Sequence, residues 1–314
     1  MIHTRFIYYM DTKDNWLLLI ATLPTKPAAA RMRLWRGARA LGCSALRDGA
    51  WLLPAGHHDA LTRLAAEVAS AGGSAELLSV VAEGEQAERF FALFDRSTDY
   101  CQLMAKIAKA AAKPDAKTVQ ALSRELKAIV TTDFFPGEAQ RQAEAALAEL
   151  VSLASGEPHT GTGAISRLAT ADFRGRIWAT RKQLWVDRMA SAWLIRRFID
   201  KKAKFLWLDN PKKCPKAALG FDFDGAAFTH VGSRVTFEVL AASFGLDTNP
   251  AIARIGTIVH CLDVGGVPVA EAAGIEALLT GLRAAAADDD KLLSEASRVF
   301  DGLYHAHRRE SDDE

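Results

Sequence analysis

Histidines and acidic residues in the second half of the chain interrupt segments that are otherwise apolar. His260 and Asp263 are three residues apart in IGTIVHCLDV, so on a helix their side chains project to the same side. Glu238 lies among apolar residues in VTFEVL, and His230 ends the segment AAFTH before a glycine-containing turn. Because burying such groups is unfavourable unless each finds a partner, we expect these residues to take part in the function of the protein. As a mixed nitrogen and oxygen donor set, the four residues suit one divalent first-row metal ion, Zn, Mn or Fe.

Two other interpretations of these four residues stay open. They could form a buried polar network that only orients the helices, or they could be unrelated surface residues. No short-range metal motif such as HExxH is present, and the four residues come from three separate segments. The metal site is therefore a hypothesis. Cys261, next to His260, points to another face of the same helix and is interpreted as a small core residue.

Basic residues surround the segment DRMASAWLIRRFID, whose apolar residues recur at helical spacing. Asp187 is placed to accept hydrogen bonds from the free amides of the first helical turn. Arg188 opposes the helix dipole there, so we expect it to have a partner, either a nearby acid or a bound anion. Guanidinium groups match tetrahedral oxyanions well, and the predicted oxyanion lining is Arg181, Lys182, Arg188, Arg196 and Arg197. A solvated basic face is the alternative.

Four arginines lie close together in the first half of the chain, beside Trp35. These residues, predicted to contact DNA phosphates, are Arg31, Arg33, Arg36 and Arg39. An exposed cationic helix face explains the same pattern, and no helix-turn-helix spacing accompanies it. The sequence therefore leaves DNA binding as a hypothesis.

The bulk composition is that of an ordinary soluble globular protein. The chain has 314 residues, 49% hydrophobic and 25% charged, with 39 Lys and Arg against 38 Asp and Glu. Its length predicts two domains, and its near-neutral charge gives no global argument for nucleic acid. No signal peptide or membrane-spanning run is expected, and the four cysteines are scattered, so a cytoplasmic, reduced protein is predicted. Neither a phosphate-binding loop nor GxGxxG occurs, so no nucleotide cofactor is expected.

The first half alternates short apolar runs with amphipathic segments. Strands are predicted at 16–23, in two halves of 43–53 around Asp48-Gly49, and at 77–81, with helices at 28–41 and 59–71. The order β-α-β-β-α-β predicts a ferredoxin-like domain. Helices at 85–113, 115–131 and 138–153 are expected to be appended to it. The polar stretch 154–163 reads as a linker, which bounds a first domain of residues 1–155.

The second predicted domain, residues 165–314, is a mixed and helix-rich α+β domain. Strands are expected at 176–180, 205–208, 221–223 and 226–229. Helices are expected at 187–200, 235–244, 250–262, 274–286 and 289–307. The fold class of the whole chain is therefore α+β.

The sequence resembles the chromate-resistance protein ChrB family along nearly its whole length. LPTKPAAARMRLWRGARALG and LRDGAWLLP are similar to the family's N-terminal module, and DRMASAWLIRRFID, FTHVG, TFEVL, SFGL, IVHCLD and EAAGI to its chromate-resistance domain. Family members often carry Cys in place of Val235 and Asp in place of Cys261. The resemblance implies a cytoplasmic protein associated with a chromate efflux transporter, usually described as a chromate-responsive regulator of the resistance operon. His230, Glu238, His260 and Asp263 match the family, so any metal-binding role would carry over to them.

Three hypotheses follow for the function. The first is a regulator whose C-terminal domain senses chromate or a related oxyanion and whose N-terminal domain binds operator DNA. The alternative is a metal-dependent enzyme acting in chromate detoxification through the His/Glu/Asp site of the C-terminal domain. The third is a protein that acts through subunit contacts, with the ferredoxin-like domains pairing edge to edge into a homo-oligomer.

Overall fold

The computed structural model describes residues 15–25, 28–155 and 165–310. The chain divides into two compact units, residues 1–106 with 120–140 and residues 107–119 with 141–314. The predicted linker at 154–163 lies almost wholly outside the described residues, so the predicted domain boundary stays a prediction. In the described ranges, no helix is both long and apolar enough to cross a membrane.

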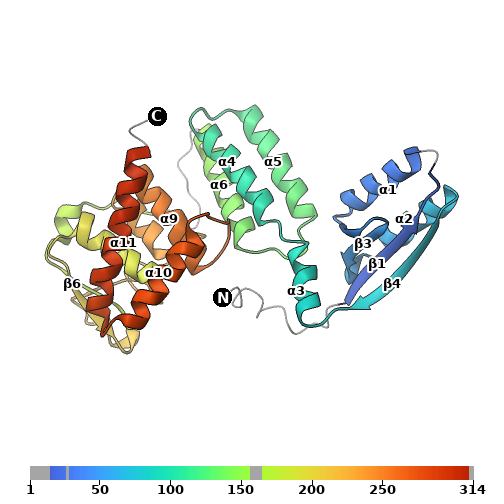
Figure 1. The fold of residues 1–314 in the computed structure, drawn as a ribbon. Coiled ribbons are helices and arrows are strands. Elements are labelled where there is room, and N and C mark those ends of the chain that lie inside the picture. The colour runs from blue at the N-terminus through green and yellow to red at the C-terminus, as the bar shows by residue number, and fades with distance from the viewer. Residues whose placement is uncertain (1–14, 26–27, 156–164, 311–314) are drawn as a thin grey trace. The chain divides into compact units, whose positions relative to one another are not determined.

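The first unit contains a four-stranded antiparallel sheet with two helices (Figure 1). Its elements are β1 (Asn15–Thr22), α1 (Ala28–Ala40), β2 (Ser44–Arg47), β3 (Ala50–Pro54), α2 (His58–Ser70) and β4 (Ser74–Val81). The strands are ordered β2-β3-β1-β4, with the first strand beside the last. This is the ferredoxin-like arrangement that the sequence predicts.

Alternation along β1 explains how this sheet holds its helices. Leu17 and Leu19 are 3% and 0% exposed and share a core with Leu34 of α1 and Leu64 of α2. The predicted turn between β2 and β3 requires its glycine, because Gly49 has a φ of 75° and a Cβ there would lie 2.6 Å from a backbone oxygen. Local turn chemistry and strand periodicity thus agree in this unit.

Four further helices follow in the chain: α3 (Glu85–Ala92), α4 (Ser97–Ala111), α5 (Ala116–Thr131) and α6 (Glu138–Ser155). The prediction of a single helix over 85–113 is therefore wrong, because the helix is interrupted between α3 and α4. Asp95 accounts for the break, since its carboxylate accepts the backbone N–H and the hydroxyl of Ser97, where α4 begins. Aspartate in this role favours a new helix start over continuation.

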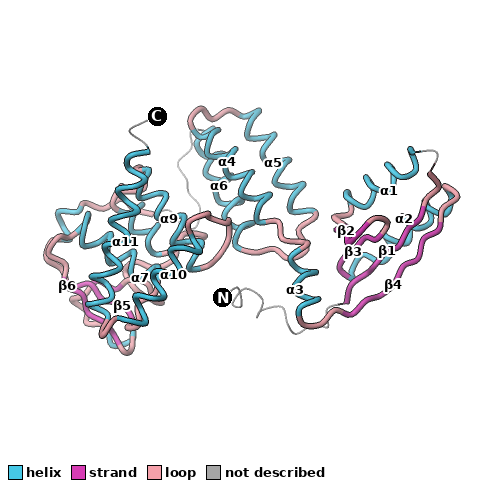
Figure 2. Tube along the Cα trace, viewed as in Figure 1, coloured by secondary structure: helices cyan, strands magenta, loops and turns pink. Residues whose placement is uncertain are grey.

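The second unit contains a three-stranded parallel sheet, whose strands Figure 2 draws in magenta. β5 (Ile177–Arg181) lies between β6 (Lys204–Leu208) and β7 (Leu219–Gly220). The strands predicted at 221–223 and 226–229 are reduced to one bridge between Phe221 and Phe228. Because the chain leaves β5 toward β6 and later returns on the other side, the carboxyl ends of β5 and β7 flank a topological switch point, where α/β sheets commonly bind ligands.

Helices pack densely around this sheet. They are α7 (Val186–Leu194), continued by a π turn at Ile195–Ile199, then α8 (Thr236–Ser243), α9 (Pro250–Asp263), α10 (Ala272–Ala285) and α11 (Asp289–Glu310). α7 is the central helix, with contacts to α8, α9 and α11, and its Met189, Trp193 and Leu194 are at most 2% exposed. A helix that is buried all round holds its few polar side chains rigidly. The α+β class and the helix-rich second half are as predicted.

Candidate functional site

Four charged residues meet at the carboxyl edge of the parallel sheet. Arg181 ends β5, Asp222 follows β7, and Asp187 and Arg188 lie in the first turn of α7. All four are therefore at the switch point between β5 and β7. Sequence reasoning missed Asp222. In the sequence it is a carboxylate between two phenylalanines, inside the segment expected as a strand at 221–223.

Two guanidinium groups converge on one oxygen of Asp222. Its Oδ2 lies 3.2 Å from Arg188 Nε and 3.4 Å from Arg181 Nη2, while Oδ1 accepts the Thr236 hydroxyl at 3.3 Å. Asp222 has a φ of 55°, in the left-handed region that few residues other than glycine, asparagine and aspartate adopt. The two arginines thus form a binding site for an anion, and in this structure the anion is the Asp222 carboxylate.

The loop between β5 and α7 is anchored to the start of α11. Asp289, at the start of α11, accepts the backbone N–H groups of Gln183 and Leu184 at 2.9 and 3.1 Å. Arg188 also holds this loop, because its Nη1 donates to the carbonyls of Arg181 and Lys182. The sequence predicts a partner for Arg188, either an acid or an anion, and the structure supplies an acid together with these two carbonyls.

Asp187 is 1% exposed and accepts four hydrogen bonds. Its oxygens receive the backbone N–H groups of Thr236 and Phe237, the Ser191 hydroxyl and the ring of His230. The first two donors are the free amides at the start of α8. Asp187 therefore caps α8 and not, as the sequence suggested, its own helix. Burial raises the pKa of Asp187 above its ordinary value, and hydrogen bonding from His230 opposes that rise.

His230 lies among three carboxylates. Its Nε2 is 3.3 Å from Asp187, 3.6 Å from Asp222 and 3.7 Å from Asp263. Hydrogen bonds to Asp187 and Asp222 raise the pKa of His230 to about 10, so the ring is an imidazolium at neutral pH. Burial, followed by the charges of Asp187 and Asp222, raises the pKa of Asp263 to about 6. The cluster therefore concentrates negative charge around one ring.

Asp263→Asn is expected to stabilise the metal-free protein at neutral pH. In the unfolded chain this carboxyl ionises at about pH 4, whereas in the fold it ionises at about 6. Its ionised form is thus disfavoured in the fold above that pH, and removing the charge should add about 1–2 kcal/mol to the free energy of unfolding. The gain should shrink as the pH falls through 6 and vanish below about 4. Urea unfolding in EDTA, compared across this range, would contradict the prediction if the gain were absent or independent of pH.

The five cations predicted to line an oxyanion site do not all meet. Arg181 and Arg188 do, at Asp222. Lys182 instead pairs with the exposed Asp209 at 2.9 Å. The converging part of the predicted set is therefore a pair of arginines at the sheet edge.

The remaining two cations of that set are turned away. Arg196 lies over the ring of Phe205, 4.8 Å from its centroid, and Arg197 pairs with Asp301 of α11 at 2.7 Å. Each is eight or nine residues beyond Arg188, which is about 12 Å along a helix. Their contacts belong to the packing of the π turn, so they take no part in the arginine pair.

The predicted metal set divides into two groups. His230 and Asp263 approach each other, whereas Glu238 and His260 form a pair of their own, with Oε2 2.8 Å from Nδ1. His260 is 2% exposed, and the same Glu238 oxygen accepts the backbone N–H of Val235 just before α8. Glu238 and His260 thus tie the start of α8 to α9. In the described ranges, the group that could hold a metal is Asp187, His230 and Asp263, with ligand atoms within 4.8 Å of one another.

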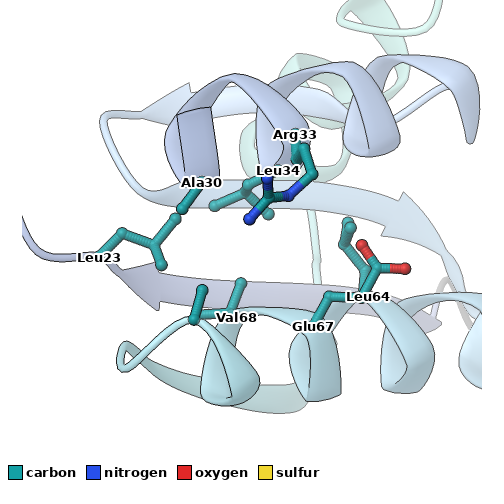
Figure 3. A pocket seen from close by; sticks show the side chains of 8 residues that line it. Leu23, Ala30, Arg33, Leu34, Leu64, Glu67 and Val68 are labelled. Carbon is teal, nitrogen blue, oxygen red and sulfur yellow. The ribbon is translucent and has the colours of Figure 1, made fainter. Parts of the chain in front are cut away.

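The four arginines predicted to bind DNA are all exposed on α1. Arg39 lies over the ring of Trp35, 5.2 Å from its centroid. Arg33 lies over the gap between α1 and α2, whose opposite wall includes Glu67 and Val68 (Figure 3). Among the described residues none of the four forms an ion pair within 4.0 Å. Their positive charge is therefore available at the surface of the first unit.

Comparison with known proteins places both halves in one family. The family model described as "Protein ChrB, N-terminal" matches residues 31–123, and the one described as "ChrB, C-terminal domain" matches residues 178–307. A Protein ChrB from Cupriavidus metallidurans is 50% identical over 304 residues, covering 92% of this chain and 94% of that protein. No solved structure matches the chain with statistical significance. The chain therefore belongs to the ChrB family of chromate-resistance proteins.

Proposed function

We propose that the protein is a chromate-responsive regulator of chromate resistance, with an oxyanion site at Arg181 and Arg188. The observation that carries this proposal is the convergence of both guanidinium groups on a single oxygen of Asp222. A chromate oxygen offers the same negative charge and acceptor geometry as that carboxylate oxygen. The position at a topological switch point also favours a ligand site.

Chromate enters this site by replacing Asp222. A dianion beside three carboxylates is repelled unless the nearest of them gives way, so Asp222 acts as an internal competitor. When chromate takes its place, Arg181 and Arg188 keep an anionic partner and Asp222 is released from the arginine pair. Thr236 belongs to the first turn of α8 and donates its hydroxyl to Asp222, so moving Asp222 alters a hydrogen bond at the start of that helix.

DNA binding is assigned to α1 in this proposal. The exposed arginines of that helix supply the charge that phosphate contacts require. For regulation, chromate must favour one state of the protein over another, because a ligand shifts an equilibrium only through its differential affinity. The proposed consequence of chromate binding is weaker affinity for operator DNA.

The double variant Arg31→Ala/Arg36→Ala is expected to weaken binding to promoter DNA. Loss of two phosphate contacts should lower the slope of log affinity against log salt by about two units. Fluorescence anisotropy over a salt series measures both effects. Arg124→Ala, which removes an exposed arginine of α5, is the matched control and should bind like the unaltered protein. DNA binding that is indifferent both to chromate and to the double variant would exclude the proposal.

A second candidate function is a metal-dependent enzyme of chromate detoxification. The observation that favours it is the cluster of Asp187, His230 and Asp263, in which His230 is 40% and Asp263 22% exposed and so open to a ligand. A carboxylate and imidazole set with an open position is what metal-assisted catalysis uses. Chromate absorbance, followed with metal-loaded protein and a supplied reductant, distinguishes the two. Loss of many equivalents of chromate per protein supports the enzyme, whereas binding without turnover supports the regulator.

A further inference from the structure

Three side chains from separate elements bring their donor atoms together at the carboxyl edge. Asp187 comes from α7, His230 from the loop before α8 and Asp263 from the last residue of α9. His230 Nε2 lies 3.3 Å from Asp187 Oδ2 and 3.7 Å from Asp263 Oδ2. One nitrogen and two carboxylate oxygens at this spacing surround a space that a single ion can occupy.

Asp187 is the fixed member of this group. The N–H groups of Thr236 and Phe237 and the Ser191 hydroxyl hold its carboxylate, and it is 1% exposed. Hydrogen bonds of this kind orient a metal ligand and limit its movement. His230 and Asp263 are partly exposed, so an ion can enter from their side and keep solvent ligands.

The charge distribution also calls for a cation at this point. Arg181 and Arg188 both engage Asp222, which leaves Asp187 and Asp263 without a guanidinium partner within 4.0 Å among the described residues. In the part of the chain that the structure describes, His230 is the one cationic side chain within 4.0 Å of both carboxylates. A divalent ion would add one more positive charge there than a protonated imidazole does, and it would contact all three donors directly.

We propose that Asp187, His230 and Asp263 bind one divalent transition-metal ion, which displaces the proton from His230 Nε2 to solvent and is coordinated there by the neutral ring. One imidazole and two carboxylates suit Mn(II), Fe(II) or Zn(II), in line with ordinary donor preferences. Glu238 and His260 remain outside this set and act as a structural pair. If chromate binds at Arg181 and Arg188 as proposed above, the ion also offsets the neighbouring carboxylates and should strengthen chromate binding.

Calorimetric titration of Mn(II) and of Zn(II) into EDTA-stripped, full-length protein tests the site without DNA or chromate. We expect one equivalent to bind, and Asp263→Asn and His230→Gln each to weaken binding at least about tenfold. Glu238→Gln is the matched control, because it alters a neighbouring acid that contacts a histidine but lies outside the set, and it should bind normally. Urea unfolding of each variant shows that loss of metal binding is not loss of the fold.

Three results would overturn this inference. The first is the absence of stoichiometric binding of either ion to the unaltered protein. The second is equal affinity in Asp263→Asn and the unaltered protein. The third is loss of binding in Glu238→Gln alone, which would move the site to Glu238 and His260. Because the titration contains no chromate and no DNA, each of these failures leaves the proposed regulatory function standing, and failure of that function leaves the metal site standing.

Discussion

Arg188→Ala is expected to weaken binding of chromate at the sheet edge strongly, and Asp222→Asn to strengthen it. Arg188 supplies the shorter of the two contacts to Asp222 Oδ2, at 3.2 Å, and is only 17% exposed. Losing a charge-assisted contact at such a site costs about 2–5 kcal/mol, which is a fall of about 30-fold or more in affinity. Asp222→Asn removes the charge of the internal competitor, so chromate should bind about tenfold more tightly. Isothermal calorimetry with chromate measures both.

The opposite signs of these two effects separate the proposal from a simple loss of structure. Arg196→Ala is the matched control, because this arginine lies on the ring of Phe205 and should leave chromate affinity unchanged. Arg188→Lys keeps the charge but loses the planar fork, so its chromate affinity should lie between those of Arg188→Ala and the unaltered protein. Weaker binding in Asp222→Asn, or an effect of Arg196→Ala as large as that of Arg188→Ala, would contradict the exchange of carboxylate for chromate.

Asp187→Ala is expected to cause the largest loss of stability of any single change at the site. It removes the acceptor of two buried N–H groups, those of Thr236 and Phe237, and the partner of His230. Removing one partner of a buried charged pair typically costs about 3–5 kcal/mol, because the remaining donors are left unsatisfied. The free energy of unfolding, measured in urea, should fall by that amount.

Two further variants serve as comparisons for Asp187→Ala. Asp187→Asn keeps one carbonyl oxygen but places an amide group opposite a backbone donor, so a smaller loss is expected. Asp263→Asn changes a carboxyl of the same cluster that does not cap α8, and it should not destabilise the metal-free protein. If Asp187→Ala unfolded at the same urea concentration as the unaltered protein, Asp187 would not be the residue that fixes the start of α8.

The fold could be predicted where local signals agree with one another. In the first unit, the period of two along β1, the Asp48-Gly49 turn and the amphipathic α1 and α2 all specify the ferredoxin-like order. The break between α3 and α4 escaped prediction, because the apolar periodicity continues across it. The hydrogen bonds that Ser97 donates to the Asp95 carboxylate decide that break, and such competing local bonds leave no trace in the hydrophobic pattern.

The candidate site could be predicted only in part. His230 and Asp263 were singled out because polar residues in apolar segments need partners, and the structure brings these two together. The sequence predicts that Asp187 caps its own helix, because sequence cannot show that the start of a helix 49 residues further along lies against it. Asp222 lies inside the segment expected as a strand at 221–223, and its position just beyond β7 is recognisable only in the folded sheet.

Residues that are close in sequence do not always share a site in the structure. His260 and Asp263 share a side of α9, yet His260 turns to Glu238 in the interior while Asp263, at the helix end, meets His230. The arginines that follow Arg188 within one predicted helix were grouped with it by sign of charge. The rise of a helix separates Arg196 and Arg197 from Arg188 by about two turns, which is too far for one small anion to contact all three.

The most direct test is a chromium anomalous difference map from crystals of the protein grown with chromate. We expect a chromium peak beside Arg181 and Arg188, with an oxygen of the anion where Asp222 Oδ2 lies now and the Asp222 carboxylate turned away from both arginines. A peak elsewhere on the protein, with Asp222 still held by the two arginines, would contradict it.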